Sequence, residues 1–238
     1  SLIVDVGAHH GFFAVGALCV HTRRAVGALS TQALMNPLYG PQGMQWLAEG
    51  VMAQDVVARL TGADAGRAQR QVHVLGAQGD AAAYTGADCV GWCGHLSGAG
   101  FSVAGNMLAG ASVLEATADA YRSAASRPLA ERLLAAMAAG EAQGGDKRGK
   151  QSAALRIHAG EDYPALDLRI DDHVEPIQEL DRLYRKSLER FQPFVACLAG
   201  RLDPVGLTDR VAIEASVSRF QAALATQATQ ATSESRAR

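Results

Sequence analysis

The feature that most limits the fold of this chain is the way its predicted helices and strands are grouped. Short apolar or alternating stretches, which predict strands, come in neighbouring pairs, and the helical stretches come in pairs between them. Helices that do not alternate singly with strands favour an α+β fold with antiparallel sheets over a doubly wound parallel sheet. Two antiparallel sheets, each covered by a helix layer, would use all of these elements, so we predict a four-layer αββα sandwich.

The elements are predicted from hydrophobic periodicity and from the glycines and prolines between them. Strands are predicted at 2–6, 13–20, 25–31, 71–75, 81–85, 101–104, 152–158 and 166–170. Helices are predicted at 41–49, 53–60, 111–125, 129–139, from Pro176 onward and at about 208–226. The glycine-rich stretch 86–100 is predicted to be irregular, and Gly140 is predicted to end a helix as a C-cap.

Composition excludes several classes of protein. The 238 residues are 48% hydrophobic with a net charge of −2, which allows a sizeable core and gives no basic face for nucleic acid. We find no apolar run of 18 residues and no basic-then-apolar leader, so we predict neither a membrane segment nor a secretory signal. The four cysteines form neither a zinc set nor a disulfide framework, which favours free thiols in a reducing, cytoplasmic compartment.

The chain divides into three predicted parts. We expect one domain over residues 1–191, a helical extension over 192–226 and a disordered, low-complexity tail over 227–238. Apolar helix faces are compatible with a homodimer.

A charge cluster, GGDKRGKQS at 144–152, stands between a predicted helix and a predicted strand. It is not a phosphate-binding loop of the Walker type, which would have the strand before it and the helix after it. Asp146 and Arg148 could orient a substrate carboxylate or amide, and Gln151 and Ser152 could donate hydrogen bonds at the strand's start. A solvated loop with charges for solubility is the alternative, and the sequence leaves both open.

Other polar stretches have similar alternatives. Asn106, predicted between a strand end and a helix start, is either an N-cap residue or a donor to a developing oxyanion. Thr31 and Gln32 end a strand and could line a cleft or belong to ordinary loop chemistry. Cys93 and His95 are a weak nucleophile pair.

Two further stretches concern metals and buried histidines. The run Asp171-Asp172-His173 is read as a helix cap more readily than as a metal site, so no metal is predicted. His73, on an apolar strand, is read as a satisfied core histidine.

These stretches together resemble one family. AVGALCVHTRRAVGALSTQALMNPLYG, RQVHVLGAQGDAAAYTGADCVGWCGH, GNMLAG, PLAERLLAAMAAGEAQGGDKRGKQSAAL and DLRIDDHVEPIQEL occur in that order over about residues 12–185. They resemble the bacterial DUF1028 family, and the GGD-x-RG-x-QSAAL and GNML elements are its most specific parts. The resemblance implies a fold similar to the N-terminal-nucleophile hydrolases, with two antiparallel sheets packed between helix layers.

The resemblance also implies a mechanism and a set of site residues. The first residue of such a chain attacks an amide carbonyl, and its own α-amino group acts as the base. Ser1 is then the nucleophile if Ser1–Val4 form the first strand; alternatively, the chain begins inside the family's second strand. Asn106, Asp146 and Arg148 are the other expected catalytic residues. The expected substrate-binding residues are Thr31, Gln32, Gly145, Gln151 and Ser152.

The resulting hypothesis is a hydrolase that acts on an amide bond in a small molecule or peptide and needs no cofactor. The alternative is a non-catalytic protein on the same fold that binds a small molecule or serves in assembly, without the nucleophile.

Overall fold

The computed structural model describes residues 12–236 and shows a mixed α+β fold. The chain divides into two compact units, residues up to Asp181 and residues from Arg182 onward. This division falls inside a helix and ten residues before the boundary expected at residue 191. The first unit contains every strand that the structure describes.

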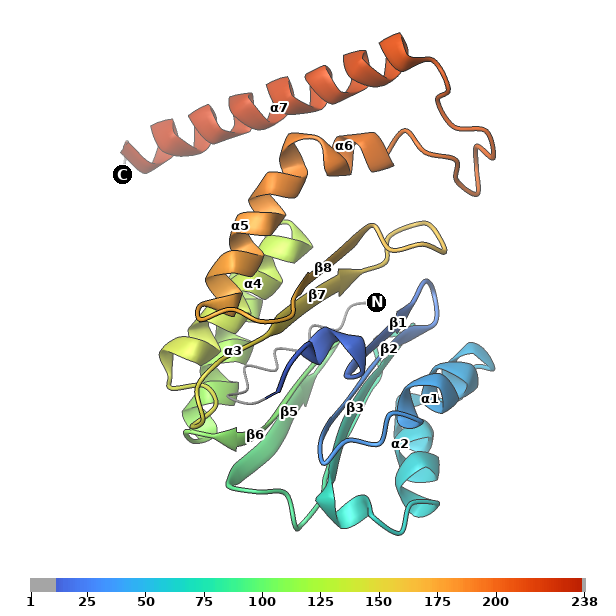
Figure 1. Cartoon of the computed structure of the whole chain (residues 1–238), viewed down its shortest axis with the longest axis vertical. Helices are drawn as coiled ribbons and strands as arrows, with labels where there is room; N and C mark the ends of the chain where they lie inside the picture. The colour runs from blue at the N-terminus through green and yellow to red at the C-terminus, as the bar shows by residue number, and fades with distance from the viewer. Residues whose placement is uncertain (1–11, 237–238) are drawn as a thin grey trace. The chain divides into compact units, whose positions relative to one another are not determined.

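The largest sheet of the first unit has four antiparallel strands in the order of the sequence (Figure 1). They are β1 (Val20–Arg23), β2 (Gly27–Ala33), β3 (Arg70–Gly76) and β4 (Ala81–Thr85). Two antiparallel pairs accompany this sheet, β5 (Trp92–Gly98) with β6 (Phe101–Leu108), and β7 (Ala153–Ile157) with β8 (Leu166–Ile170). The predicted hairpin of 71–75 and 81–85 is therefore confirmed as β3 and β4.

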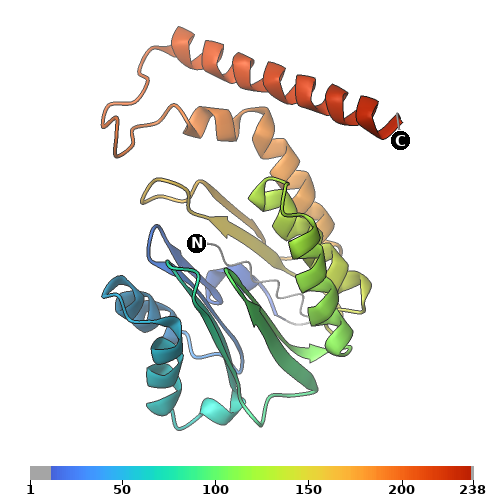
Figure 2. The same cartoon turned by 180° about the vertical axis from the view of Figure 1, so that it is seen from behind.

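Two helices cover one face of the four-stranded sheet (Figure 2). They are α1 (Tyr39–Ala48) and α2 (Ala53–Gly62), close to the predicted ranges. Because side chains alternate along a strand, Leu29, Val72 and Val74 all point to these helices and join their apolar residues in one core cluster. Burial of this cluster holds the helices on the sheet.

The other face of the four-stranded sheet packs against β5 and β6 and includes buried polar side chains. Gln71 and His73 alternate with Val72 and Val74 and are buried on that side. The Nδ1 atom of His73 lies 3.2 Å from the Ser102 hydroxyl of β6. Its Nε2 atom has no hydrogen-bond partner among the described residues. The prediction of a satisfied core histidine therefore holds for Nδ1 and not for Nε2.

Helices α3 (Ala111–Ser123) and α4 (Leu129–Ala142) pack on each other, and α3 lies against β5 and β6. Gly140 does not end α4, contrary to the prediction, but lies inside it. A Cβ atom built there would stand 2.3 Å from Thr117 Oγ1, so this glycine permits the close approach of α3 and α4.

Two secondary-structure predictions near the site are wrong. Residues 13–20 were predicted as a strand, but Val15–Ala17 form a short 3-10 helix, η1, because the backbone turns to a left-handed φ of 55° at Ala14. Gly16 then lies against β7, where an added Cβ would stand 2.4 Å from that of Ala154.

The stretch 86–100 was predicted as irregular, but it contains β5, which pairs with β6. Trp92 of β5 and Val103 of β6 pack on the α3 residues Val113 and Leu114. This tertiary packing outweighs the low strand propensity of the glycines.

The second unit contains the rest of α5 (Pro176–Glu189), with α6 (Phe191–Val195) and α7 (Arg210–Arg236). Pro176 begins α5 as predicted. Arg190 donates from Nη1 to Glu214 at 2.8 Å, which ties the end of α5 to α7. Helix α7 continues ten residues beyond the predicted end, through the segment expected to be disordered. No helix within residues 12–236 is long and apolar enough to cross a membrane.

Candidate functional site

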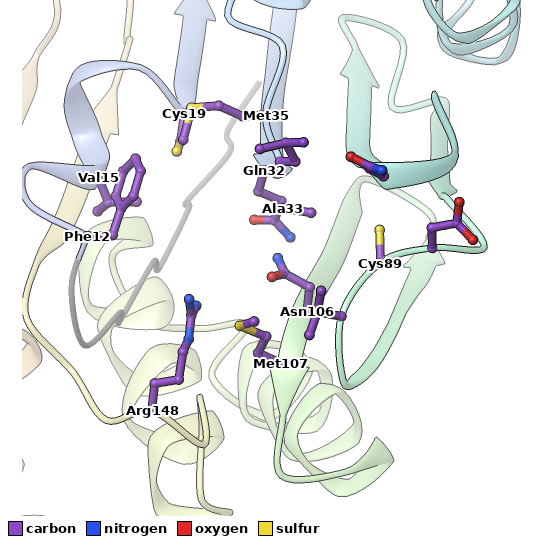
Figure 3. A pocket seen from close by; sticks show the side chains of 14 residues that line it. Phe12, Val15, Cys19, Gln32, Ala33, Met35, Cys89, Asn106, Met107 and Arg148 are labelled. Atoms are coloured by element: carbon purple, nitrogen blue, oxygen red, sulfur yellow. The ribbon is translucent and has the colours of Figure 1, made fainter. Parts of the chain in front are cut away.

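A cavity of about 450 Å³ opens where β2 and β6 end, beside η1 and the loop that contains Arg148 (Figure 3). Its polar lining includes the side chains of Gln32, Asn106 and Arg148, and its apolar lining includes Phe12 and Val15. A cavity with an apolar wall and a few converging polar groups is typical of a small-molecule site. The cavity thus brings together three of the residues that the sequence singled out.

The side-chain amides of Gln32 and Asn106 belong to the polar wall, and a third buried amide, Gln71, hydrogen bonds to both. Gln32 donates from Nε2 to Oε1 of Gln71 at 2.6 Å, and Asn106 donates from Nδ2 to the same oxygen at 3.4 Å. Gln71 is fully buried, and Gln32 and Asn106 are nearly so. Asn106 lies inside β6, so the prediction that it sits between a strand and a helix is wrong, because β6 runs four residues further than expected.

The backbone is strained directly beside two of these amides. Ala33 follows Gln32 with a φ of 65°, and Met107 follows Asn106 with a φ of 54°. Both residues line the cavity. Left-handed conformations in residues other than glycine cost free energy and cluster at functional sites. The ends of β2 and β6 therefore share a geometry that places an amide at the cavity wall.

Arg148 reaches the cavity from a turn that Asp146 stabilises. The Arg148 guanidinium donates from Nε and Nη2 to the two oxygens of Asp146 at 3.0 and 2.7 Å, and its backbone N–H donates to Oδ1 at 2.8 Å. Burial raises the pKa of the Asp146 carboxyl to about 6, and the hydrogen bond from the Arg148 backbone N–H opposes that shift. Asp146 is thus a positioning partner behind Arg148.

Ser152 fixes the apolar wall from outside the cavity. Its fully buried hydroxyl accepts from the Val15 N–H and donates to the Phe12 carbonyl, both at 3.1 Å. It therefore holds the turn that carries these two lining residues. The predicted donation from Ser152 to a substrate stays a prediction.

Three other predicted binding residues do not line the cavity. Thr31 is buried and lies 3.4 Å from the carbonyl oxygen of Asn36. Gly145 accepts through its carbonyl from the Ala109 N–H at 2.9 Å. Gln151 donates to Asp172 at 2.9 Å, at the entry of β7. Ser1 lies outside the described residues.

Two thiols, Cys19 and Cys89, also line the cavity. Cys89 donates to the Arg70 carbonyl at 3.3 Å, and burial raises the pKa of its thiol. A protonated, hydrogen-bonded thiol is a poor nucleophile. The Cys93–His95 hypothesis finds no support either, since His95 Nδ1 lies 2.9 Å from the Thr85 hydroxyl and Cys93 points to the Cys89 carbonyl.

The run at Asp171–His173 behaves as a turn: His173 accepts from the Glu175 N–H at 2.9 Å. Within residues 12–236, no group of acidic, histidine or cysteine side chains is placed to hold a metal ion.

Gln71 is the site residue that the sequence reasoning missed. Its signal is the alternation in QVHVL, where the polar residues share the face opposite to the valines. A buried strand with one polar face indicates a polar network between two sheets.

Comparison with known proteins identifies the family of the chain. The DUF1028 family, described as a family of unknown function, matches residues 4–180. The chain belongs to the DUF1028 family. A crystal structure of another DUF1028 protein, from Silicibacter pomeroyi, is 30% identical in sequence with a TM-score of 0.76, and the match covers 88% of this chain and 97% of that one. A search of curated proteins finds no match.

Proposed function

We propose that this DUF1028 chain is a hydrolase of the N-terminal-nucleophile type that cleaves an amide bond in a small molecule held in the cavity. The observation that carries the proposal is the convergence of Gln32, Asn106 and Arg148 on one cavity at the ends of β2 and β6. The corresponding fold proposal is that the sheets and their covering helices form the four-layer αββα sandwich of these hydrolases. The predicted homodimer and cytoplasmic location stay predictions.

The proposed chemistry follows from the groups that the cavity holds. The hydroxyl of the first residue, proposed to be Ser1, attacks the amide carbonyl while the α-amino group takes its proton. Asn106, with a second N–H beyond the one that faces Gln71, stabilises the tetrahedral oxyanion. The C–N bond breaks, the leaving amine takes the proton, and water then hydrolyses the acyl ester. Arg148 pairs with a carboxylate of the substrate.

The experiment that tests this proposal has two steps. Intact-mass analysis of the purified protein first determines whether Ser1 is the mature N-terminus. Ser1→Ala and wild type are then assayed against a panel of N-acyl amino acids for release of the free amine. We expect hydrolysis by wild type and loss of at least about 100-fold in Ser1→Ala. Equal activity of the two proteins, or none in either, contradicts the proposal.

A second candidate function is binding without catalysis. It is favoured by one observation: the described lining residues supply hydrogen-bonding amides, the cation of Arg148 and the carboxylate of Asp88, whereas burial raises the pKa of the Cys89 thiol among them. A protein of this kind would bind the N-acyl amino acids of the same panel in a calorimeter and release no amine.

A further inference from the structure

Backbone carbonyls set the orientation of the Gln71 amide, which hydrogen bonds to the two amides at the cavity wall, Gln32 and Asn106. Gln71 Nε2 lies 2.9 Å from the Gly94 carbonyl oxygen and 3.0 Å from that of Gly105, and these two residues are cross-strand partners in β5 and β6. A carbonyl oxygen only accepts hydrogen bonds. The nitrogen of Gln71 must therefore face these carbonyls, because the opposite orientation would bring oxygen against two oxygens.

This orientation dictates those of the neighbouring amides. With Nε2 turned to β5 and β6, Oε1 of Gln71 faces Gln32 and Asn106 and can only accept from them. Both neighbours consequently turn their nitrogens toward Gln71. Figure 3 shows the nitrogens of Gln32 and Asn106 close to one another and their oxygens on the side of Arg148.

We propose that Gln71 is a positioning residue that fixes the polarity of the cavity, holding the amide nitrogens of Gln32 and Asn106 so that their carbonyl oxygens accept hydrogen bonds from a ligand with an N–H donor. This inference rests on the proposed function only in taking the cavity as a ligand site. Gln71 itself touches no ligand, because its oxygen and nitrogen are both engaged within the protein.

The chemical class of the ligand follows from this polarity. Two acceptors beside a guanidinium fit a secondary amide that carries a carboxylate: the amide N–H binds an acceptor, and the carboxylate pairs with Arg148. A site built to accept a hydrogen bond discriminates strongly against an analogue without the donor, because a buried carbonyl is then left unpaired. Tertiary amides should therefore bind poorly.

Nuclear magnetic resonance tests the positioning. In the full-length protein, exchange of the side-chain NH2 protons of Gln32 and Asn106 should be at least about tenfold slower than that of Gln45, which is exposed on α1. Gln71→Met, similar in volume but unable to bond, should remove that protection. His73→Gln perturbs the same face of β3 without touching either amide and should preserve it.

Three NMR outcomes would overturn the positioning role. The first is fast exchange of both NH2 groups in wild type, an outcome that does not depend on any variant folding. The second is protection of the two NH2 groups that persists in Gln71→Met. The third is a loss of protection in His73→Gln equal to that in Gln71→Met.

A matched pair of probes tests the polarity. N-acetylglycine and N-acetylsarcosine carry the same carboxylate and acetyl group, but only the first has an amide N–H. Titration of wild type should show at least about tenfold tighter binding of N-acetylglycine, and Gln71→Met should abolish the difference. Equal affinities, or no binding of either up to their solubility, would overturn the ligand class. Because the preference is read from affinity and not from product release, a preference for N-acetylglycine in a protein that hydrolyses neither probe supports this inference while refuting the proposed hydrolase.

Discussion

Gln32 and Gln71 are direct cross-strand partners in β2 and β3, and their side chains are joined by a 2.6 Å hydrogen bond at the cavity wall. Gln71 continues the connection to β5 and β6 through the carbonyls of Gly94 and Gly105. A single buried amide thus links the edge of the cavity to both sheets, so that the position of each cavity amide depends on the packing between them.

Replacing Asn106 should separate catalysis from binding. Asn106→Leu removes the proposed oxyanion donor, so we expect kcat for an N-acyl amino acid to fall by about 100- to 1000-fold with a much smaller change in KM. Asn106→Asp keeps the size but places a negative charge beside the oxyanion, and should be equally impaired. Steady-state kinetics of both variants check this. A change confined to KM would refute the oxyanion role.

Replacing Arg148 should weaken binding of carboxylates only. In calorimetric titrations, Arg148→Met should bind N-acetylglycine about ten- to 100-fold more weakly than wild type, with no change for the neutral N-acetylglycinamide. Arg148→Lys should recover only part of the loss, because an ammonium cannot form the two-point contact with Asp146. Arg122→Met on α3, which also removes a paired guanidinium, is the control. Equal losses of affinity for N-acetylglycine and N-acetylglycinamide would contradict the pairing of Arg148 with the ligand's carboxylate.

Because of His73, the free energy of unfolding should depend on pH. Burial lowers the pKa of its imidazole to about 4, with a smaller contribution from His95. Between the ordinary histidine pKa of about 6.5 and that value, the unfolded chain binds more protons than the folded one, so the free energy of unfolding should fall as pH falls. The free energy of unfolding should be about 3 kcal/mol lower near pH 4 than above about pH 6.5.

Urea unfolding of wild type and His73→Gln across this pH range measures the contribution. The variant should lose the His73 part of the pH dependence and keep that of the other histidines. Identical slopes for the two proteins would mean that His73 titrates normally.

Gly140 should tolerate no side chain. Gly140→Ala places a methyl group against Thr117 Oγ1, so we expect it to lower the free energy of unfolding by about 1–3 kcal/mol. Gly62→Ala at the end of α2, where an added Cβ meets nothing within 4 Å, is the matched control and should be neutral or slightly stabilising. Thermal unfolding of both variants checks this. Equal changes in the two variants would show that helix propensity, and not packing against Thr117, sets the effect on the free energy of unfolding.

The sequence was informative where local patterns agree with tertiary packing. The paired helices, the β3–β4 hairpin and the start of α5 follow from periodicity and from Pro176. Asn106, Gln32 and Arg148 were identified as site candidates from their places beside strand ends and glycines. The family resemblance was also confirmed.

The failures have tertiary causes. The turn at Ala14 depends on Ser152, which is 137 residues away from Val15 in the chain, and β5 is a strand because β6 and α3 cover its glycines. Gln71 was missed because hydrophobic periodicity weighs only the valines of QVHVL. The hydrogen bonds that make it central involve four other strands, β2, β4, β5 and β6, and single-strand patterns do not encode them.

The most direct test of the proposal that the first residue is the nucleophile is to identify the residue that an electrophile acylates. Incubation with a small β-lactone, followed by intact-mass analysis and peptide mapping, should show one adduct on the N-terminal residue, and Arg148→Met and Asn106→Leu should slow its formation. The account predicts an ester at the first residue that N-acetylglycine protects competitively. No adduct, or one confined to Cys19 or Cys89, would contradict it.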